Sequence, residues 1–299
     1  MASTRHTPGC RGREVPLFRA RDRNQRVDVA EFLYLRCEIC GLIRLAEPPE
    51  DLGRYYPNAY YEIPTFERLT VRAAKDTFRI DTVRRYSRPQ RLLEIGAGWG
   101  TFAFQAKQAG YQVDAVEMDK RCCEFLDRSV GVRTVCSVLP HEAIATLGPH
   151  EVIALWHVIE HLADPWALLT AAAANLTPGG ILVLATPNPD ALQFRIMGAD
   201  WPHVDAPRHL YLLPRHVLIG YVEPLGLVCV AASATNEDAR AANRFGWQKL
   251  LMNRVEGRWL TEFVCKAGRG VAALFAPFET RDFNGSSYTL ILRKGSSEQ

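Results

Sequence analysis

The 299-residue sequence has no long apolar run, no internal repeat, no low-complexity segment and little excess charge of either sign. No stretch reaches the roughly 18 uninterrupted apolar residues that a membrane-spanning helix requires. The 36 basic and 33 acidic residues give a net charge of +3, which does not by itself favour a nucleic-acid partner. The first 30 residues lack the apolar core of a secretory signal. We therefore expect a cytoplasmic globular protein with reduced thiols.

The eight cysteines then need an explanation other than disulfides. Cys37 and Cys40 form a Cys-x-x-Cys knuckle followed by glycine, a spacing that lets two thiolates bind one tetrahedral zinc ion. Upstream, only Cys10 stands where a second pair is expected, because position 7 is Thr. Either His6 supplies the fourth ligand or no metal binds, and we favour zinc. The other five cysteines lie in predicted helices and strands, where they are expected to pack as small apolar residues.

Strand and helix patterns alternate between residues 69 and 234. Short apolar strands are predicted at 91–95, 111–116, 132–136, 151–155, 181–185 and 227–232, with a seventh at 288–293. Helices are predicted at 69–86, 101–109, 120–129, 165–176 and 214–225. Strands that are separated by crossover helices predict an α/β fold, in which a parallel sheet has helices on both faces.

A glycine-rich turn is predicted between the first strand and the helix that follows it. Glycine at 96, 98 and 100 permits positive φ and lets a ligand approach the backbone, while the helix behind offers free N–H groups. Glu117 follows the second strand, where a carboxylate can accept both hydroxyls of a ribose. A dinucleotide dehydrogenase would favour glycine at position 101, which is Thr here.

In these residues the chain resembles the class I methyltransferases that use S-adenosylmethionine. Glu94-x-Gly96-x-Gly98-x-Gly100 matches their first motif, and Glu117 matches their ribose-binding acid. The resemblance covers about residues 69–234 and, more weakly, the last strand. It implies a Rossmann-like seven-stranded sheet whose last strand is antiparallel. The cofactor contacts that it implies come from Glu94, Gly96, Ala97, Gly98, Gly100, Glu117, Met118, Ser137, Val138 and Trp156.

A second motif follows the fourth strand and reads His157-Val-Ile-Glu-His161-Leu-Ala-Asp-Pro165. It resembles a run in the branch that includes ubiquinone-type O-methyltransferases and many sugar- and lipid-modifying relatives. The resemblance implies that His157 lies closest to the transferred methyl. That methyl is already activated, so a base is needed only if the acceptor must lose a proton. His157 is either that base or a residue that holds the site in shape, and the second role is favoured for His161.

The loop 201–211 combines aromatic, acidic and basic residues and resembles the acceptor-side loop of the same branch. His209 is the second candidate base, or else a loop histidine that caps the next helix. Trp201 and Tyr211 either wall an acceptor pocket or pack in the core. The N-terminus also resembles this branch, whose members often carry two Cys-x-x-Cys pairs before a Pro- and Tyr-rich segment. This similarity supports a zinc site at His6, Cys10, Cys37 and Cys40.

These patterns predict an N-terminal cysteine-containing segment over residues 1–65 and a methyltransferase domain over 69–299. A helical insertion at 237–285 precedes the last strand and is expected to cover the acceptor site. Its alternative role is contact with a membrane surface, because amphipathic helices with basic residues suit anionic headgroups. The seven arginines between residues 5 and 26 are diluted by acids, so we expect a solvated surface and no nucleic-acid partner.

The predicted activity is transfer of a methyl group from S-adenosylmethionine to a small-molecule or glycan-linked acceptor, with oxygen as the favoured atom. One alternative is a binding module that keeps the fold and has no catalytic activity. Others are methylation of a nucleotide-sugar carbon or of a lipid-linked substrate. A nucleic-acid amino methyltransferase is disfavoured, because the sequence lacks an Asn/Asp-Pro-Pro-Tyr motif and Ala185-Thr-Pro-Asn188 after the fifth strand is not one.

Overall fold

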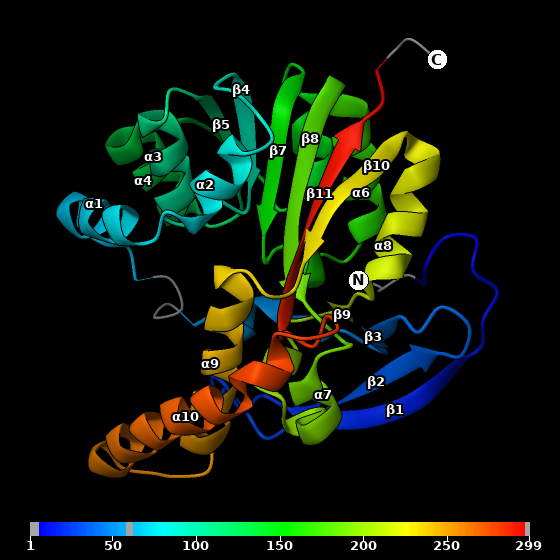
Figure 1. Cartoon of the computed structure of the whole chain (residues 1–299), viewed down its shortest axis with the longest axis vertical. Coiled ribbons are helices and arrows are strands. Elements are labelled where there is room, and N and C mark those ends of the chain that lie inside the picture. Colours follow the sequence, from blue (N-terminus) through cyan, green and yellow to red (C-terminus); the bar gives the residue numbers. More distant parts are fainter. Residues whose placement is uncertain (1–5, 58–61, 297–299) are drawn as a thin grey trace.

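The computed structural model describes residues 6–57 and 62–296 and contains a large mixed sheet flanked by helices (Figure 1). In spatial order its strands are β10 Leu227–Ser233, β11 Ser287–Lys294, β8 Leu176–Pro187, β7 His150–Trp156, β4 Arg91–Ile95, β5 Gln112–Glu117 and β6 Arg133–Cys136. Strand β11 is antiparallel to both of its neighbours, and the strands from β8 to β6 are parallel. All seven predicted strands are present, so the predicted fold class is confirmed.

Helices lie between the strands where the sequence predicts them, with one correction. They are α3 Thr101–Gln108, α4 Lys120–Phe125, α6 Pro165–Asn175 and α8 Arg215–Val222. Two short helices, α5 Pro140–Ala145 and α7 Leu192–Met197, were not predicted. The single helix predicted over 69–86 is wrong, because two helices are present, α1 Phe66–Lys75 and α2 Phe78–Arg84. The backbone leaves the helical region at Asp76, where the buried side chain of Gln105 donates to the carbonyl oxygens of Ala73 and Asp76. These tertiary hydrogen bonds replace those that a continuous helix would make.

The N-terminal segment forms a second, antiparallel sheet that the sequence analysis did not predict. Strands β1 Glu14–Arg21, β2 Glu31–Cys37 and β3 Ile43–Leu45 are joined at the edge by β9 Tyr211–Leu212 from the methyltransferase region. This small sheet lies below the carboxyl edge of the large sheet in Figure 1. Its buried side chains, such as Phe32 and Tyr34, belong to the same apolar core as Leu93 of β4. The segment is therefore packed into the fold.

The insertion between β10 and β11 is a pair of helices, α9 Glu237–Met252 and α10 Arg258–Glu279. The helical insertion predicted at 237–285 is thus present, and its second helix has 22 residues. Trp247 stacks on Phe275 at 4.5 Å between ring centroids, which joins α9 to α10. Helix α9 also contacts β11 and lies at the carboxyl edge of the parallel strands (Figure 1). Among the described residues, neither of these helices nor any other is long and apolar enough to cross a membrane.

Candidate active site

The glycine loop connects β4 to α3 and has the backbone that its sequence requires. Gly96, Gly98 and Gly100 have φ values of 69°, 54° and 83°, a region that residues with a Cβ rarely adopt. A Cβ on Gly96 would also lie 2.4 Å from Cγ2 of Val158, in the loop after β7. Glycine at 96 is therefore required both by the backbone conformation and by the close approach of the neighbouring loop.

Glu117 lies at the end of β5 and is held against this loop. Its carboxylate accepts a hydrogen bond from the Gly98 N–H at 2.7 Å and from the Met118 N–H at 2.7 Å. The Ser137 N–H donates to the Glu117 carbonyl oxygen at 2.8 Å, which brings the end of β6 to the same place. The side chains of Met118 and Val138 are 48% and 72% exposed beside it. The structure thus brings together the residues predicted to hold ribose and adenine.

Three buried polar atoms around the glycine loop make no hydrogen bond with a described residue. They are Glu94 Oε2, Thr101 Oγ1 and Trp156 Nε1. Burial raises the pKa of Glu94 to about 8, although the nearby charge of Arg79 partly opposes this. Trp156 packs against Phe102 with ring centroids 5.6 Å apart, so it is largely a core residue. Buried polar groups are normally satisfied, so these three atoms are hydrogen-bonding groups that the described residues leave unused at the glycine loop.

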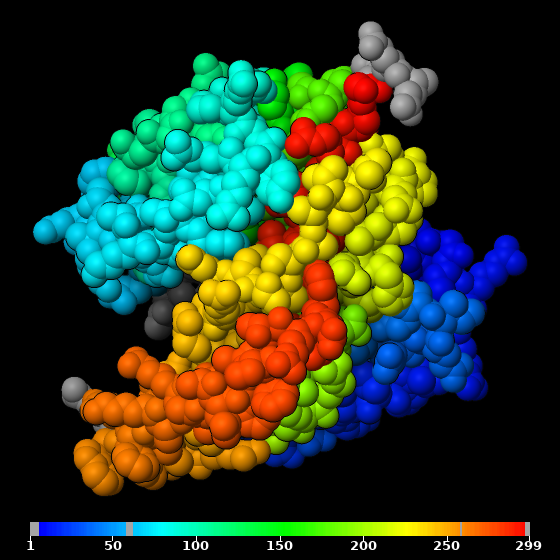
Figure 2. All heavy atoms as spheres, viewed as in Figure 1, coloured from blue at the N-terminus to red at the C-terminus, as the bar shows by residue number. Residues whose placement is uncertain are grey.

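Arg79 is a residue of this region that the sequence analysis missed. It lies on α2, and its guanidinium carbon is 5.4 Å from the centroid of the Trp156 ring. Its positive charge helps to lower the pKa of both Glu94 and Asp238. The space-filling view shows a recess between the α1–α2 region and α9 (Figure 2). A cation in this position can bind a ligand carboxylate.

A cavity of about 470 Å³ lies beside this recess, at the carboxyl edge of β7 and β8. Five segments line it: the loop after β1, the loop after β7, the end of β8 at Pro187, the loop 202–209 and helix α9. The lining includes Asn24, Gln25, His157, Glu160, His161, Pro202, His203, Asp205, His209, Asp238, Ala241, Ala242, Phe245 and Lys249. Trp201 and Tyr211 do not line it, because both are buried in the core.

His157 is held between two carboxylates. Its Nε2 lies 2.9 Å from Asp238 of α9, and its Nδ1 lies 3.5 Å from Glu160. Burial alone would lower the pKa of His157, but the charge of Asp238 and its hydrogen bond, together with Glu160, raise it to about 10. Burial would likewise raise the pKa of Glu160, yet the contact with His157 lowers it to about 2. His157 is therefore an imidazolium at neutral pH, which cannot accept a proton.

His209 and His161 are neutral, and each is oriented by a backbone carbonyl. His209 Nδ1 lies 2.8 Å from the His203 carbonyl oxygen, and His161 Nδ1 lies 3.1 Å from the Arg208 carbonyl oxygen. A carbonyl can only accept, so His209 Nδ1 carries the proton and His209 Nε2 has a free lone pair. His161 Nδ1 also lies 2.9 Å from the Tyr56 hydroxyl, so it has two neighbours at that nitrogen. Burial lowers the pKa of His209, and it lowers that of His161 to about 4 with help from the neighbouring His209. The His161 and His209 rings pack edge to face, with their centroids 4.5 Å apart.

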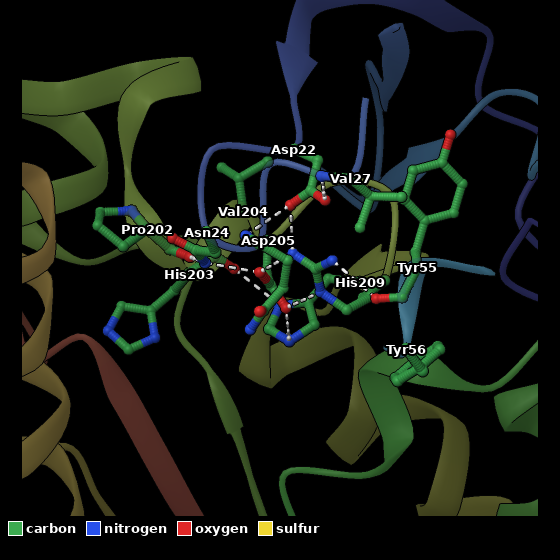
Figure 3. Close-up of polar contacts among 12 residues, drawn as sticks. Asp22, Asn24, Val27, Tyr55, Tyr56, Pro202, His203, Val204, Asp205 and His209 are labelled. Atoms are coloured by element: carbon green, nitrogen blue, oxygen red, sulfur yellow. Dashed lines mark hydrogen bonds and ion pairs between the residues drawn. The ribbon is translucent and has the colours of Figure 1, made fainter. Parts of the chain in front are cut away.

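A buried ionic network fixes the loop that carries His209. The side chain of Arg208 is fully buried and lies 2.6 Å from Asp22 and 2.7 Å from Asp205. Asn24 donates to Asp205 at 2.6 Å (Figure 3). The Tyr34 hydroxyl donates to the His209 carbonyl oxygen at 2.8 Å. The N-terminal segment therefore holds the loop 201–211 in place. Sequence reasoning missed Asp22 and Arg208, because they are 186 positions apart and no local pattern joins them.

Two groups of described residues bring metal-binding atoms together. His6, Cys10, Cys37 and Cys40 have their ligand atoms within 4.8 Å of one another, which fits the three sulfurs and one nitrogen of a tetrahedral zinc site. The second group is Glu160, His161 and His209, whose carboxylate and imidazole atoms meet the same limit at the acceptor cavity. Two imidazoles and one carboxylate suit several divalent cations.

The seven-stranded sheet with antiparallel β11, and the glycine loop that faces Glu117, define a nucleotide-binding protein of the Rossmann-like methyltransferase type. A family model described as "Methyltransferase domain" matches residues 67–232, more than half of the chain. The chain therefore belongs to this family, the class I S-adenosylmethionine-dependent methyltransferases.

The curated relatives carry the name ubiquinone biosynthesis O-methyltransferase. The one from Bordetella avium is 28% identical over 154 residues, which are 48% of this chain and 61% of that protein. The one from Cereibacter sphaeroides is 32% identical over 117 residues, 37% of this chain and 47% of that protein. The chain thus spans between about half and three fifths of these relatives. A methyltransferase structure from Archaeoglobus fulgidus has a TM-score of 0.51 at 19% identity and covers 76% of this chain and 94% of its own, which shows the shared fold.

Proposed function

We propose that the protein transfers the methyl group of S-adenosylmethionine to an oxygen of a small-molecule or glycan-linked acceptor by direct displacement. The observation that carries this proposal is the arrangement of the carboxyl edge. There the glycine loop and Glu117 adjoin a cavity that contains a neutral, oriented histidine. Direct displacement needs such a pair of adjoining sites, one for the methyl donor and one for the acceptor.

The residues present suit the methyl donor along its whole length. The carboxylate of Glu117 would bind the ribose hydroxyls, and Met118, Ser137 and Val138 would flank the adenine. Gly96, Ala97, Gly98 and Gly100 supply the close backbone approach. The unsatisfied atoms of Glu94 and Trp156 would meet the polar methionine end, where Arg79 would bind the carboxylate. When bound, the donor supplies an activated methyl on a sulfonium. Aligning this methyl with the acceptor atom therefore supplies much of the rate enhancement.

Of the two base candidates, the contacts favour His209 over His157. A base must have a free lone pair, and His209 Nε2 has one, whereas His157 is protonated and paired with Asp238. His209 would take the proton of the acceptor hydroxyl as the oxygen attacks the methyl, and would then release it to water. His157 would hold α9 at the edge of the sheet and place a fixed positive charge beside the acceptor. His161 would support His209 by packing against its ring.

A divalent cation on Glu160, His161 and His209 is an alternative way to activate the hydroxyl. The observation in its favour is that one carboxylate oxygen of Glu160 and one imidazole nitrogen each of His161 and His209 lie within 4.8 Å of one another. A cation there would lower the pKa of a bound hydroxyl and so replace the base. Elemental analysis of a Cys37→Ser variant, which lacks the thiolate pair of the knuckle, would separate this site from the zinc site. Retention of a stoichiometric metal would favour the cation, and its absence would favour His209 as base.

We also propose that the exposed face of α10 contacts a membrane surface. Trp259, Phe263, Leu274 and Phe278 are exposed and fall within about 100° of one another around the helix. Exposed basic residues such as Lys266 lie on the same helix and suit anionic headgroups. Sedimentation with anionic vesicles should capture the wild type and release the Trp259→Ser variant. A Val228→Ser variant, which changes an exposed residue of β10, should behave as the wild type.

Release of S-adenosylhomocysteine, measured across candidate phenols, sugars and lipid-linked glycans, tests the activity. For an accepted substrate, His209→Gln should lower kcat by about 100-fold or more, the usual loss of a general base. Its affinity for S-adenosylhomocysteine should stay the same. The control His141→Gln changes a partly exposed histidine on α5 and should have wild-type activity. If the wild type binds the cofactor but forms no product with any acceptor class, the non-catalytic binding module is the better account.

A further inference from the structure

The acceptor cavity is a trough that follows one face of α9. Its lining residues on this helix are Asp238, Ala241, Ala242, Phe245 and Lys249. They recur every three or four positions, which places them along one face of the helix. With a rise of 1.5 Å per residue, the 11 positions from Asp238 to Lys249 span about 16 Å. One end of the trough therefore lies at the pair of His157 and Asp238, and the other end lies at Lys249.

Lys249 is the charged lining residue that has no counterion among the described side chains. Its Nζ donates to the Asn24 carbonyl oxygen at 3.1 Å, and no described carboxylate lies within 4.0 Å of it. Lys249 is half-buried, and burial lowers its pKa, as does the nearby positive charge of Arg26. Asp205 and Asp22 are the acidic groups closest to it, but both are bound to Arg208.

The other charges of the trough are paired inside the protein. Asp205 is bound by Arg208 and Asn24, while Asp238 is bound by His157 and by the Ser287 hydroxyl. Partly buried charges normally have a partner, because desolvation without one is costly. Lys249 thus retains N–H donors that face a cavity and no carboxylate to receive them. A ligand anion would form an ion pair with Lys249, as carboxylates do with the other cations of the trough.

The walls between the two ends are apolar and aromatic. Phe245 is 44% exposed, and its ring lies 5.3 Å from that of His203. Ala242 and Pro202 lie beside them, and the side-chain amide of Gln25 has no hydrogen-bond partner among the described residues. A flat or ring-shaped body fits such walls, and an amide at the cationic end can donate to an anion.

We propose that the acceptor carries an anionic group, a carboxylate or a phosphate, which Lys249 binds at the end of the trough remote from His157. This inference rests on the proposed function, since it assumes that the trough holds the methyl acceptor. It selects acceptors in which the reacting hydroxyl, held at His209, and the anionic group are separate parts of one molecule that lies along the trough. It also gives the N-terminal segment a role in recognition, because the carbonyl of Asn24 positions the ammonium group.

The test is equilibrium binding of phenyl phosphate, benzoate and neutral benzamide to the full-length protein, with and without saturating S-adenosylhomocysteine. The anionic probes should bind at least tenfold more weakly to Lys249→Gln than to the wild type, whereas benzamide should not distinguish the two. The control Lys75→Gln removes an exposed lysine of α1 and should bind as the wild type. Tighter binding of phenyl phosphate than of benzoate would identify a phosphate as the group, and the reverse order a carboxylate.

Equal binding of an anion to the wild type and Lys249→Gln, or no measurable binding of either anion, would overturn the proposal. The arm without S-adenosylhomocysteine keeps this failure apart from failure of the proposed function. If S-adenosylhomocysteine does not bind but anion binding still depends on Lys249, the anion site is supported and the proposed methyl transfer is contradicted. If S-adenosylhomocysteine binds and anion binding does not depend on Lys249, only the anion site is wrong.

Discussion

Replacing Asp238 with Asn tests whether α9 is held to the catalytic edge by a charge pair. Asn keeps an acceptor for the Ser287 hydroxyl, which bonds Asp238 at 2.6 Å, but it cannot pair with the imidazolium of His157. A hydrogen bond to a charged group contributes about 1.5–3 kcal/mol. The side chains of His157 and Asp238 are 29% and 11% exposed, so solvent screening places the expected loss in the lower half of that range. We expect the free energy of unfolding to fall by about 2 kcal/mol at pH 6.

The loss of stability expected for Asp238→Asn depends on pH in a direction that the pKa shifts of His157 and Asp238 determine. The folded pKa of His157 is raised, so its stabilisation is complete below the unfolded value of 6.5 and is lost as pH rises through about 10. The folded pKa of Asp238 is lowered, so its share is present above about 3.8 and is lost in acid. The difference between variant and wild type should therefore be largest between about pH 4 and 6.5 and should shrink toward pH 10.

Urea unfolding at pH 6, 8 and 10 is the assay, with Glu237→Gln as the matched control. Glu237 is the neighbouring acid in the first turn of α9 and makes no ion pair with a described residue. Both substitutions remove one negative charge from the start of the helix, so their difference isolates the contact with His157. A loss for Asp238→Asn no larger than that for Glu237→Gln would refute the reasoning, as would a loss that does not change between pH 6 and 10.

Three further predictions concern other parts of the structure. Gly96→Ala should lower the free energy of unfolding by more than the roughly 1–2 kcal/mol that a strained positive φ costs. The control Gly179→Ala, where φ is +77° and the space is open, should show that strain alone. Equal losses in urea unfolding would contradict the close contact at Gly96. Asp22→Asn should lower the free energy of unfolding by about 1.5–3 kcal/mol, because the fully buried Arg208 loses one of its two carboxylates. It should also raise KM for the acceptor without changing cofactor affinity. An unchanged free energy of unfolding would count against the network. Purified protein should contain one zinc per chain by atomic absorption and Cys40→Ser should contain none, and a wild type without zinc would show that the knuckle is not a metal site.

The large sheet could be predicted because each of its elements has a local signature. Apolar runs of five or six residues mark the strands, and glycine or proline marks where helices begin and end. Asp164 accepts a hydrogen bond from the Ala167 N–H at 2.9 Å with Pro165 in the first position, as the sequence indicates. The glycine loop could be predicted for the same reason, because its conformation is a property of the residues in the loop itself.

The features that escaped prediction depend on contacts between distant parts of the chain. Strand β9 has two residues and becomes a strand only because β3 pairs with it. Asp238 lies 81 positions from His157, so nothing near either residue shows that they form an ion pair. That contact changes the charge of His157, because an isolated histidine is mostly neutral at pH 7 and this one is held as a cation. The break between α1 and α2 has a similar origin, since it is stabilised by the side chain of Gln105 from α3.

The most direct test of the central claim is calorimetric binding of S-adenosylmethionine and S-adenosylhomocysteine to the wild type and to Glu117→Ala. Glu117 lies at the end of β5 beside the glycine loop, in the position to accept the ribose hydroxyls. We predict one-to-one binding of both ligands to the wild type and at least tenfold weaker binding to the variant, the loss expected when a charge-assisted hydrogen bond to the ligand is removed. No heat of binding from the wild type, or equal affinity of the two proteins, would contradict the account.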